Sequence, residues 1–423
     1  MNKTKKNMIL FLFGKLVSLF GTRIYAFAMS LYILKVTKSG LNFSISILLS
    51  TIPILIFGPI GGVIADRLDR KKMVLITDFL SGIVMLIAFV LSTIFGLQIW
   101  IIYMSTVLLS ILNILFSTSF DASVPNLVDD ENIGKINSYN HSIRSLSTII
   151  GPVIGGAVYA LVHPTMFILF NGISFILSTI SEGFIDFYWK VGKNTIKTNN
   201  KKIEVFSQIK EGFTYIKTKP EIMVIIKSCL ILNFLFTTTT VVIPHILVVQ
   251  YPISERSFGI IQACLGIGSL LISILFANKM GKYKPIKIGL YTILLGILII
   301  ACSIPVIFTS LMSIQYFSPI YYGIISFAVG CIIVLINIPF EVYLQETTDN
   351  EYRGRVISLI VTIASAITPI GYLLHGLLLD YIETSFIIIY AGIGMFFIAA
   401  YIISKSNKLK KETNLIPQPA PVD

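Results

Sequence analysis

The sequence is poor in charge. Only 13% of its 423 residues are Asp, Glu, Lys or Arg, whereas 55% are hydrophobic. A mean hydropathy of +0.85 excludes an ordinary soluble globular domain. Long apolar runs recur from about Met8 to Ser404, so we expect nearly the whole chain to be embedded in a membrane.

Cysteine is also scarce, and the four cysteines all fall inside apolar segments: Cys229, Cys264, Cys302 and Cys331. The sequence has no Cys-x-x-Cys pair and no Cys/His cluster, which argues against disulfides and against a metal site. It also has no Ser/His/Asp set and no phosphate-binding loop. We therefore expect no cofactor and no enzymatic activity, and a polytopic membrane enzyme or receptor is only a remote alternative.

The charges that are present lie mostly in loops on one side of the apolar runs. The formal net charge is +12, but loop Lys and Arg beside membrane spans report topology and lipid contact, so we do not expect a nucleic-acid partner. The opposite loops hold only Lys35, Lys38 and Arg256. Because basic loops face the cytoplasm, both termini are predicted to be cytoplasmic in a multi-pass protein of the cell membrane.

The first apolar run superficially resembles a signal peptide, since it follows Lys3, Lys5 and Lys6. It carries Lys15 and Arg23 and continues to Leu34 without a small-residue cleavage site. It is therefore predicted to be a retained first helix.

Twelve apolar segments are long enough to cross a bilayer at about 20 residues per crossing. Their predicted limits are 8–34, 41–65, 73–95, 98–120, 139–161, 165–189, 222–249, 257–277, 285–308, 318–344, 355–379 and 384–404. An even number of spans agrees with two cytoplasmic termini. The predicted fold class is all-α, a polytopic membrane protein with twelve transmembrane helices.

The long connection at 190–221 begins basic and then carries apolar residues at helical spacing from Ile203 to Ile216. This pattern predicts an amphipathic helix on the cytoplasmic leaflet that ends near Pro220. The predicted organisation is a six-helix bundle at 1–189, a linker at 190–221, a second six-helix bundle at 222–404 and a disordered cytoplasmic tail at 405–423.

Two short segments repeat between the halves of the chain. The stretch DENIGKINS at 130–138 matches NEYRGRVIS at 350–358, and each precedes an apolar span. A weaker echo links 65–72 with 277–284, where Asn278 replaces Asp66. Such a repeat predicts two parallel six-helix halves with a substrate site between them near mid-membrane.

The segment GGVIADRLDRKK at 61–72 resembles the Gly-x-x-x-Asp-Arg-x-x-Arg-Lys loop of major facilitator transporters. A fuller resemblance, over roughly residues 10–400, is to the drug:proton antiporter branch that includes macrolide efflux permeases. It rests on this loop with Asp78, on EGFTY at 211–215 and on GRVISL at 354–359. The resemblance implies the major facilitator fold and efflux.

In that family an Asp-Arg-Asp set latches the outward-open state, and the resemblance assigns this role to Asp66, Arg70 and Asp121, with Arg67 beside them. An anion at a positive helix end is stabilised there, and an arginine can bridge two carboxylates. The alternative is that these are only topogenic loop charges. Asp69 departs from the family, since many members have Gly at that position.

The fifth span contains a second motif, Gly151-Pro152-Val153-Ile154-Gly155-Gly156. It matches the Gly-Pro-x-x-Gly-Gly element associated with antiporters of this superfamily, although a longer form of the element would have glycine where Ser147 stands. Glycine permits close helix packing and proline bends a helix. The motif favours an exporter, but Gly/Pro clusters are common in any membrane helix.

In this fold the first, fourth, seventh and tenth spans line the cavity, which gives a set of cargo-site candidates: Arg23, Tyr25, Phe27, Asn113, Phe116, Asn233, Phe236 and Asn337. Aromatic and amide groups with few charges suit a large amphipathic or apolar molecule. The alternative for many of the Phe residues is a lipid-facing position, and for Arg23 it is a structural pairing.

Ionisable residues within spans are costly and are therefore functional candidates. The proton-coupling candidates are Asp78, Glu182, Glu341 and His375. None is an acidic residue at mid-membrane, where a proton-exchanging carboxyl is expected. For Asp78 the alternative is a structural partner such as Arg70 or Arg144, and for His375 it is a hydrogen-bonded structural role.

The sequence therefore predicts a secondary active efflux transporter for hydrophobic or amphipathic small molecules, drug or macrolide-like, that works by alternating access and proton antiport. An uptake or metabolite permease of the same fold is the alternative. The expected partners are the cargo, protons and membrane lipids, and we expect a monomer.

Overall fold

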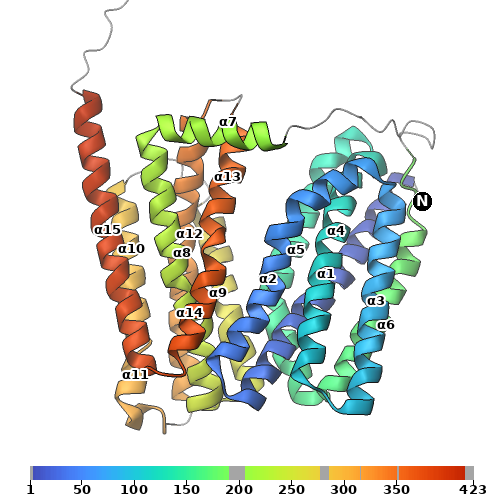
Figure 1. Ribbon diagram of the computed structural model, residues 1–423, viewed down its shortest axis with the longest axis horizontal. Coiled ribbons are helices and arrows are strands. Elements are labelled where there is room, and N and C mark those ends of the chain that lie inside the picture. Colours follow the sequence, from blue (N-terminus) through green and yellow to red (C-terminus); the bar gives the residue numbers. More distant parts are fainter. Residues whose placement is uncertain (1–2, 190–204, 277–284, 315, 350–351, 415–423) are drawn as a thin grey trace, which may run out of the picture. The chain divides into compact units, whose positions relative to one another are not determined.

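The computed structural model describes residues 3–189, 205–276, 285–314, 316–349 and 352–414. All regular secondary structure in these ranges is helical (Figure 1). Twelve helical segments of the described chain are long and apolar enough to cross a membrane. An apolar chain in hydrocarbon must satisfy its backbone hydrogen bonds locally, and the α-helix does so. The predicted all-α, twelve-span fold is confirmed.

The chain divides into two compact units. The first unit comprises Met1–Lys202 and Leu247–Gly266, and the second comprises Ile203–Ile246 and Ile267–Asp423. The contacts thus assign Leu247–Gly266 to the first unit, whereas the sequence pattern assigns it to the second bundle. The first unit contains α1 (Lys3–Thr37), α2 (Gly40–Arg67), α3 (Arg70–Phe95), α4 (Ile99–Leu127), α5 (Asp130–Leu161), α6 (Pro164–Gly183) and the first part of α9 (Glu255–Phe276).

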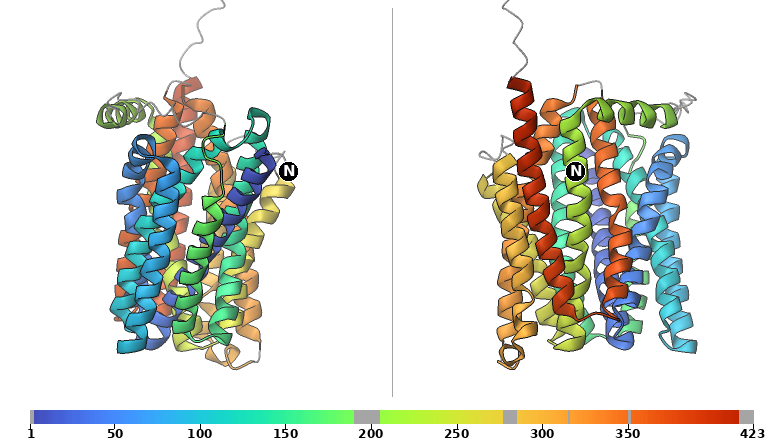
Figure 2. Two further views of the ribbon diagram at one scale, coloured as in Figure 1. Left: turned by 90° about the vertical axis from the view of Figure 1, so that its right-hand side faces the viewer. Right: turned by 60° about the vertical axis from the view of Figure 1, so that its left-hand side comes forward.

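The second unit is built on the remaining helices. These are α7 (Val205–Thr218), α8 (Pro220–His245), the rest of α9, α10 (Pro285–Ala301), the short α11 (Ile304–Ile307) and η3 (Thr309–Leu311), α12 (Phe317–Thr347), α13 (Arg353–Ala366), α14 (Thr368–Leu378) and α15 (Thr384–Asn414). A π-helical turn, Ile246–Gln250, follows α8. Helices α10 and α15 lie side by side (Figure 2).

Helix α7 occurs where the periodicity of the long connection predicted a helix. It runs across the ends of its neighbours α8 and α13 instead of alongside them (Figure 1). Tyr215 of α7 stacks on Tyr352 with ring centroids 5.0 Å apart. Its hydroxyl also accepts a hydrogen bond of 3.1 Å from the backbone N–H of Asp349. These contacts fasten α7 to the start of α13.

Two boundaries differ from the sequence prediction. The predicted span 355–379 is interrupted at Ile367 between α13 and α14, and Pro369 sits in the first turn of α14, where its missing N–H is tolerated. Helix α15 continues to Asn414, ten residues beyond the predicted end of the last span at 404. The final part of the predicted disordered tail, 415–423, lies outside the described residues.

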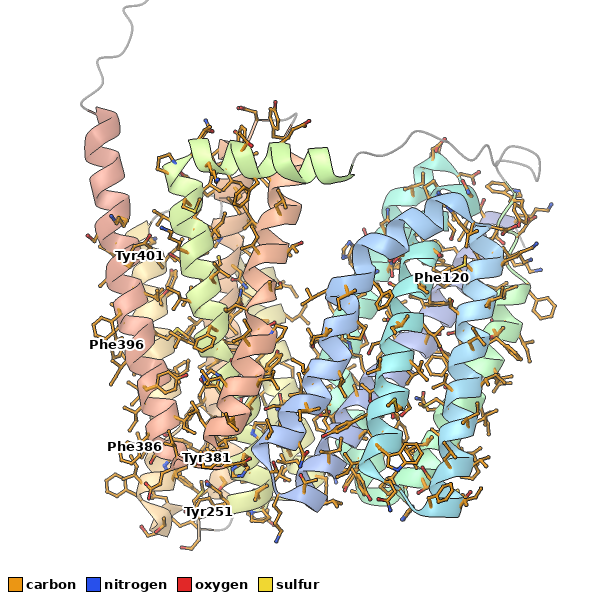
Figure 3. The ribbon with its side chains drawn as sticks, in the orientation of Figure 1. Phe120, Tyr251, Tyr381, Phe386, Phe396 and Tyr401 are labelled. Carbon is orange, nitrogen blue, oxygen red and sulfur yellow. The ribbon has the colours of Figure 1, made fainter. Side chains whose placement is uncertain are left out.

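The first unit has a dense apolar core. One cluster contains Phe11 of α1 with Phe116 and Phe120 of α4, and a second contains Phe175 of α6; all four rings are at most 2% exposed. Figure 3 shows Phe120 on α4 among its neighbours. In contrast, Phe386 on α15 is 63% exposed and points away from the second unit (Figure 3). Exposed aromatic and aliphatic side chains on spanning helices are expected where lipid covers the protein.

Candidate functional site

A cavity of about 170 Å³ lies inside the first unit, among α1, α2 and α4. Three of the predicted cargo-site residues, Arg23, Tyr25 and Asn113, line it. The other lining residues are hydroxyl-bearing or apolar: Leu19, Thr22, Ala26, Ser50, Thr51, Ile54, Thr106, Leu109 and Ser110. A cation, an amide and several hydroxyls among apolar walls can orient a molecule that is mostly apolar.

The polar groups of this cavity are held by their neighbours. The Tyr25 hydroxyl lies 2.7 Å from the hydroxyl of Ser105. The Asn113 amide donates a hydrogen bond of 3.3 Å to the Thr22 hydroxyl. Because drug-sized ligands occupy roughly 300–1,000 Å³, this cavity can hold only part of such a molecule.

Two predicted cargo residues of the first unit lie elsewhere. Phe27 stacks on Phe258 of α9 with ring centroids 5.5 Å apart. Phe116 is packed in the apolar core against Phe120, with ring centroids 5.0 Å apart. Neither lines the cavity, because aromatic side chains at these positions find apolar partners within the unit.

The predicted cargo residues of the second unit are spread over two helices. On α8, Phe236 is half-buried, and the Asn233 amide donates a 3.0 Å hydrogen bond to the carbonyl oxygen of Ala364. On α12, Asn337 is exposed, and so are Glu341 and Gln345. These three residues follow one another at four-residue spacing, which places them on one face of the helix.

Helix α5 carries a comparable polar face in the first unit. His141, Arg144, Ser145 and Thr148 are all exposed and fall on one side of the helix. Polar groups on a spanning helix are costly against lipid and are expected to face a water-filled passage. Each unit thus presents one polar stripe on a spanning helix.

The most extensive charge cluster surrounds Asp121 at the end of α4. The Lys15 ammonium, whose side chain is completely buried, lies 2.9 Å from Asp121 Oδ1. Arg144 pairs with Asp121 Oδ2, and the Asn140 amide donates a 2.9 Å hydrogen bond to Oδ1. A buried lysine requires such a partner, since removing one member of a buried pair leaves an uncompensated charge.

The structure describes only some of the side chains of the predicted loop latch. Arg70 donates a 2.6 Å hydrogen bond to the carbonyl oxygen of Ala122, one residue beyond Asp121. The side chains of Asp66 and Arg67 lie outside the described residues. The structure thus brings Arg70 to the backbone of α4 one residue after Asp121, the residue that Lys15 and Arg144 share.

The Gly-Pro-x-x-Gly-Gly motif packs α5 against α1 and α9 within the first unit. A Cβ on Gly156 would collide with the backbone carbonyl oxygen of Glu255. Conversely, a Cβ on Gly259 would lie 2.5 Å from the carbonyl oxygen of Pro152. A Cβ on Gly155 would lie 2.8 Å from the ring of Phe27. The motif is therefore a surface for close backbone approach.

An ion pair closes the same α5–α9 contact region. Lys35, near the end of α1, pairs with Glu255, the first residue of α9. The Lys35 ammonium also lies 5.5 Å from the ring centroid of Tyr159 on α5, within cation–π range. Glu255 is stabilised at this position because it lies at the positive end of the helix dipole.

Two of the proton-coupling candidates lie close together in the first unit. Asp78 and Glu182 are 2% and 0% exposed. The hydroxyl of Ser18 donates to Asp78 at 2.9 Å, and the hydroxyl of Ser178 donates to Glu182 at 3.3 Å. The two serine oxygens lie 3.4 Å apart. Among the described residues, Asp78 contacts Ser18 and forms no ion pair with Arg70 or Arg144, the partners of the sequence alternative.

The other two candidates are in the second unit. Both ring nitrogens of buried His375 are engaged: Nδ1 lies 2.8 Å from the Thr237 hydroxyl, and Nε2 lies 3.0 Å from the Thr238 hydroxyl and contacts the Tyr390 hydroxyl. This supports the structural alternative for His375, because three neutral hydroxyls hold the ring. Glu341 belongs to the exposed stripe of α12.

Sequence reasoning missed several of these partners. It did not connect Lys15 with Asp121, Lys35 with Glu255, or Ser18 with Ser178. The charged residues carried a signal, since each is a lone charge at the edge of a span and needs a counter-ion. The serines carried no such sequence signal, because serine is common in membrane helices and its hydroxyl often hydrogen-bonds to the backbone of its own helix.

The family model described as "Major Facilitator Superfamily" matches residues 11–370. The chain is a member of this superfamily. Macrolide efflux protein A of Streptococcus pyogenes is 24% identical over 372 residues, covering 87% of this chain and 88% of the relative. The putative bacilysin exporter BacE of Bacillus subtilis is 25% identical, covering 92% and 93%. The multidrug efflux pump Tap of Mycolicibacterium fortuitum is 24% identical, covering 90% and 91%.

Solved structures of major facilitator proteins share the fold. A crystal structure of the peptide transporter POT in complex with sulfate aligns with a TM-score of 0.65 at 12% identity, covering 94% of both chains. The nucleoside transporter NupG aligns with a TM-score of 0.65 at 12% identity, covering 96% of this chain and 99% of that one. At this identity the likeness shows the fold alone.

Proposed function

We propose that this major facilitator protein is a secondary active exporter of hydrophobic or amphipathic small molecules, working by alternating access and driven by proton antiport. The observation that carries the proposal is the cavity among α1, α2 and α4, where Arg23, Tyr25 and Asn113 converge. A single cation with an amide and a phenol among apolar walls suits an amphipathic guest that carries a polar or anionic group.

Three further observations support this direction and mechanism. Relatives named for macrolide efflux, bacilysin export and multidrug efflux align over most of their length. The exposed polar stripes of α5 and α12 provide one water-facing side in each unit. The basic loops at 66–72 and 278–287 favour cytoplasmic termini in the cell membrane. We expect a monomer to suffice, since the cavity lies within one unit of one chain.

For the cytoplasmic loop we retain the latch hypothesis in a sharper form. Asp121 is the shared acceptor, held by Lys15 and Arg144. Arg70 reaches the same end of α4 through the carbonyl oxygen of Ala122. In this form Asp66 and Arg67 act through Arg70, and the latch depends on the N-terminal half.

The test uses inverted membrane vesicles from cells that express the full chain, with ethidium as an amphipathic probe. An acidic lumen is expected to drive ethidium accumulation, and a protonophore is expected to release it. Vesicles without the protein are the control. Ethidium loss from the lumen under the same gradient would instead identify an uptake permease of the same fold.

The same vesicles test the cavity. Arg23→Ala removes the only cation among the lining residues and is expected to change the order of preference among cationic, neutral and anionic probes, favouring cations by several-fold. The matched control is Lys38→Ala, which removes a cation just after the end of α1, away from the cavity. Identical probe preferences in both variants would assign Arg23 a structural role.

A further inference from the structure

The two buried carboxyl groups of the first unit form one connected group with two hydroxyls. The hydrogen-bond chain consists, in order, of four oxygen atoms: Asp78 Oδ1, Ser18 Oγ, Ser178 Oγ and Glu182 Oε1. Successive atoms lie 2.9, 3.4 and 3.3 Å apart. It joins α3, α1 and α6. The second oxygens, Asp78 Oδ2 and Glu182 Oε2, are buried and have no hydrogen-bond partner among the residues that the structure describes.

The surroundings do not neutralise two negative charges. Lys15 on α1 faces Glu182, but its ammonium is already paired with Asp121 of α4, which Arg144 of α5 also contacts. At the start of α3, Lys71 is turned to the carbonyl oxygens of Gly183 and Ile185, at 3.1 and 3.3 Å. Two uncompensated carboxylates inside a membrane-spanning bundle would be very costly.

The packing makes room for the Glu182 carboxyl in particular. A Cβ on Gly14 would lie only 2.7 Å from Glu182 Oε1. The Ser178 hydroxyl also lies 3.5 Å from the carbonyl oxygen of Gly14. Glycine at this position of α1 therefore allows the carboxyl to lie directly against the helix backbone.

The number of hydrogen atoms that the oxygen–oxygen contacts need sets the number of protons that this hydrogen-bond chain holds. Three oxygen–oxygen contacts need three hydrogens, but Ser18 and Ser178 supply one each. With one additional proton, Glu182 donates to Ser178, Ser178 donates to Ser18, and Ser18 donates to Asp78, so that every contact is filled. The reverse direction, starting from Asp78, is equally complete. A second additional proton would make the other carboxyl group neutral as well, and its O–H would find no hydrogen-bond acceptor among these four side chains.

We propose that Asp78, Ser18, Ser178 and Glu182 form a site for one exchangeable proton, shared between the two carboxyl groups through the serine hydroxyls. Binding forms one carboxyl O–H bond, and release returns the proton to water and leaves the second carboxylate charged. Transfer between the ends breaks and forms three O–H bonds in a row, with no net loss of hydrogen and no change of oxidation state.

This site would bind the proton that the proposed antiport exchanges, and its physiological role therefore rests on the proposed function. It lies about one helical turn from the cargo cavity along α1, since Ser18 contacts Asp78 and Ser178, and Thr22, four residues later on the same face, lines the cavity. Loss of the proton would leave two carboxylates against the same stretch of α1. Their repulsion can then be relieved by a movement of α1, which would alter the cavity that the next turns of the same helix line.

Proton binding itself is tested without transport, by infrared difference spectroscopy of the purified full-length protein between alkaline and acidic buffers. We expect a protonated-carboxyl band that Asp78→Asn and Glu182→Gln each abolish. The reason is that an amide donates at one end of the chain, so the remaining carboxylate needs no proton. Glu131→Gln, which changes an exposed carboxylate of α5, is expected to leave the band intact.

Two outcomes would overturn the shared site. If each variant keeps about half of the band, the carboxyls bind protons independently. If the band persists in both variants, or responds to sodium instead of pH, the site is not a proton site. Ser18→Ala is the second variant, because it keeps both carboxyls but interrupts the chain. It should shift the titration midpoint of the band, whereas Ser119→Ala, another buried serine, should not.

Coupling is tested separately in proteoliposomes with ethidium. Asp78→Asn is expected to retain downhill ethidium exchange but to lose accumulation driven by a pH gradient. Wild-type accumulation by this variant would show that the site does not couple transport. If the unmodified protein moves no ethidium, the proposed function fails for that cargo, while the infrared result still decides whether the proton site exists.

Discussion

The buried charge of Lys15 within the first span has a specific partner. Lys15 is completely buried yet lies 2.9 Å from Asp121, and the cation is further bordered by the ring of Phe120, with its centroid 5.7 Å away. A lysine in hydrocarbon is stabilised by such an ion pair and by an aromatic face. Lys15, which is an isolated charge in the sequence, is therefore not isolated in the fold.

Asp69, the residue that departs from the family pattern, has a local structural role. It is the N-cap of α3, and its carboxylate accepts a 3.2 Å hydrogen bond from the backbone N–H of Lys72. The Tyr188 hydroxyl donates to the other carboxylate oxygen. Partial burial alone would raise the pKa of Asp69, but the hydrogen bonds from Tyr188, Lys72 and Lys71 outweigh it and lower that pKa. Burial and the Asp69 carboxylate raise the pKa of Tyr188 to about 12.

We therefore predict that Asp69→Ala lowers the stability of the first unit by about 1 kcal/mol at pH 7, the usual cost of removing an N-cap. Because the pKa of Asp69 is lower in the folded protein, its contribution is complete above the unfolded value of about 3.9 and is lost as pH falls through the folded value. Thermal unfolding in detergent from pH 7 down to pH 3 measures this.

The control for that prediction is Tyr188→Phe, which removes the second hydrogen bond and leaves the cap. It should have a smaller effect than Asp69→Ala at pH 7. A difference between wild type and Asp69→Ala that was already absent at pH 6 would contradict the assigned pKa direction.

At the scale of elements, the close contact between α5 and the first part of α9 depends on a glycine in each helix. The backbones approach so closely that Gly156 and Gly259 each face a carbonyl oxygen of the other helix. Backbone cannot rotate away as a side chain can, so even one added methyl group must move a helix.

We predict that Gly156→Ala destabilises the protein by about 1–3 kcal/mol, the usual cost of overpacking. Gly134→Ala on the same helix is the matched control, since a Cβ there meets nothing within 4 Å. Alanine at that position should be neutral or stabilise by up to about 1 kcal/mol, because its helix propensity is higher. Melting temperatures in detergent compare the two, and equal losses would refute the close-packing role.

At the scale of the whole molecule, one ion pair joins the two halves of the sequence within the first unit. The side chains of Lys35 and Glu255 are 35% and 23% exposed, so their pairing contributes about 0–1 kcal/mol. A contact this weak could break and re-form during the proposed alternating-access cycle. The proposed alternating access requires that some contact between the halves does so.

We predict that joining these positions stops transport. The variant carries Lys35→Cys and Glu255→Cys after the four natural cysteines have been replaced. A short thiol cross-linker between the two new cysteines should block ethidium accumulation. Reduction of a cleavable cross-linker should restore it. Each single cysteine variant treated in the same way is the control. Full transport by the bridged protein would mean that this contact stays closed throughout the cycle.

Hydropathy and charge by themselves determined the number of spans, the helical class and the helix at Val205–Thr218. These features are local, because a chain in lipid must satisfy its hydrogen bonds within each segment. The motif residues also pointed to the superfamily that the comparisons show. Among the cargo candidates, Arg23, Tyr25 and Asn113 do share one cavity.

Only the tertiary structure decided which polar groups meet. Ser18 contacts Ser178, Lys15 contacts Asp121 and Lys35 contacts Glu255, and each of these pairs joins helices far apart in the sequence. It also decided that Phe116 lies in a core and not in the cavity. The physical reason is that pairing depends on the rotation and spacing of packed helices, which hydropathy does not encode. The proton chain of Asp78 and Glu182 could therefore emerge only once three helices were placed together.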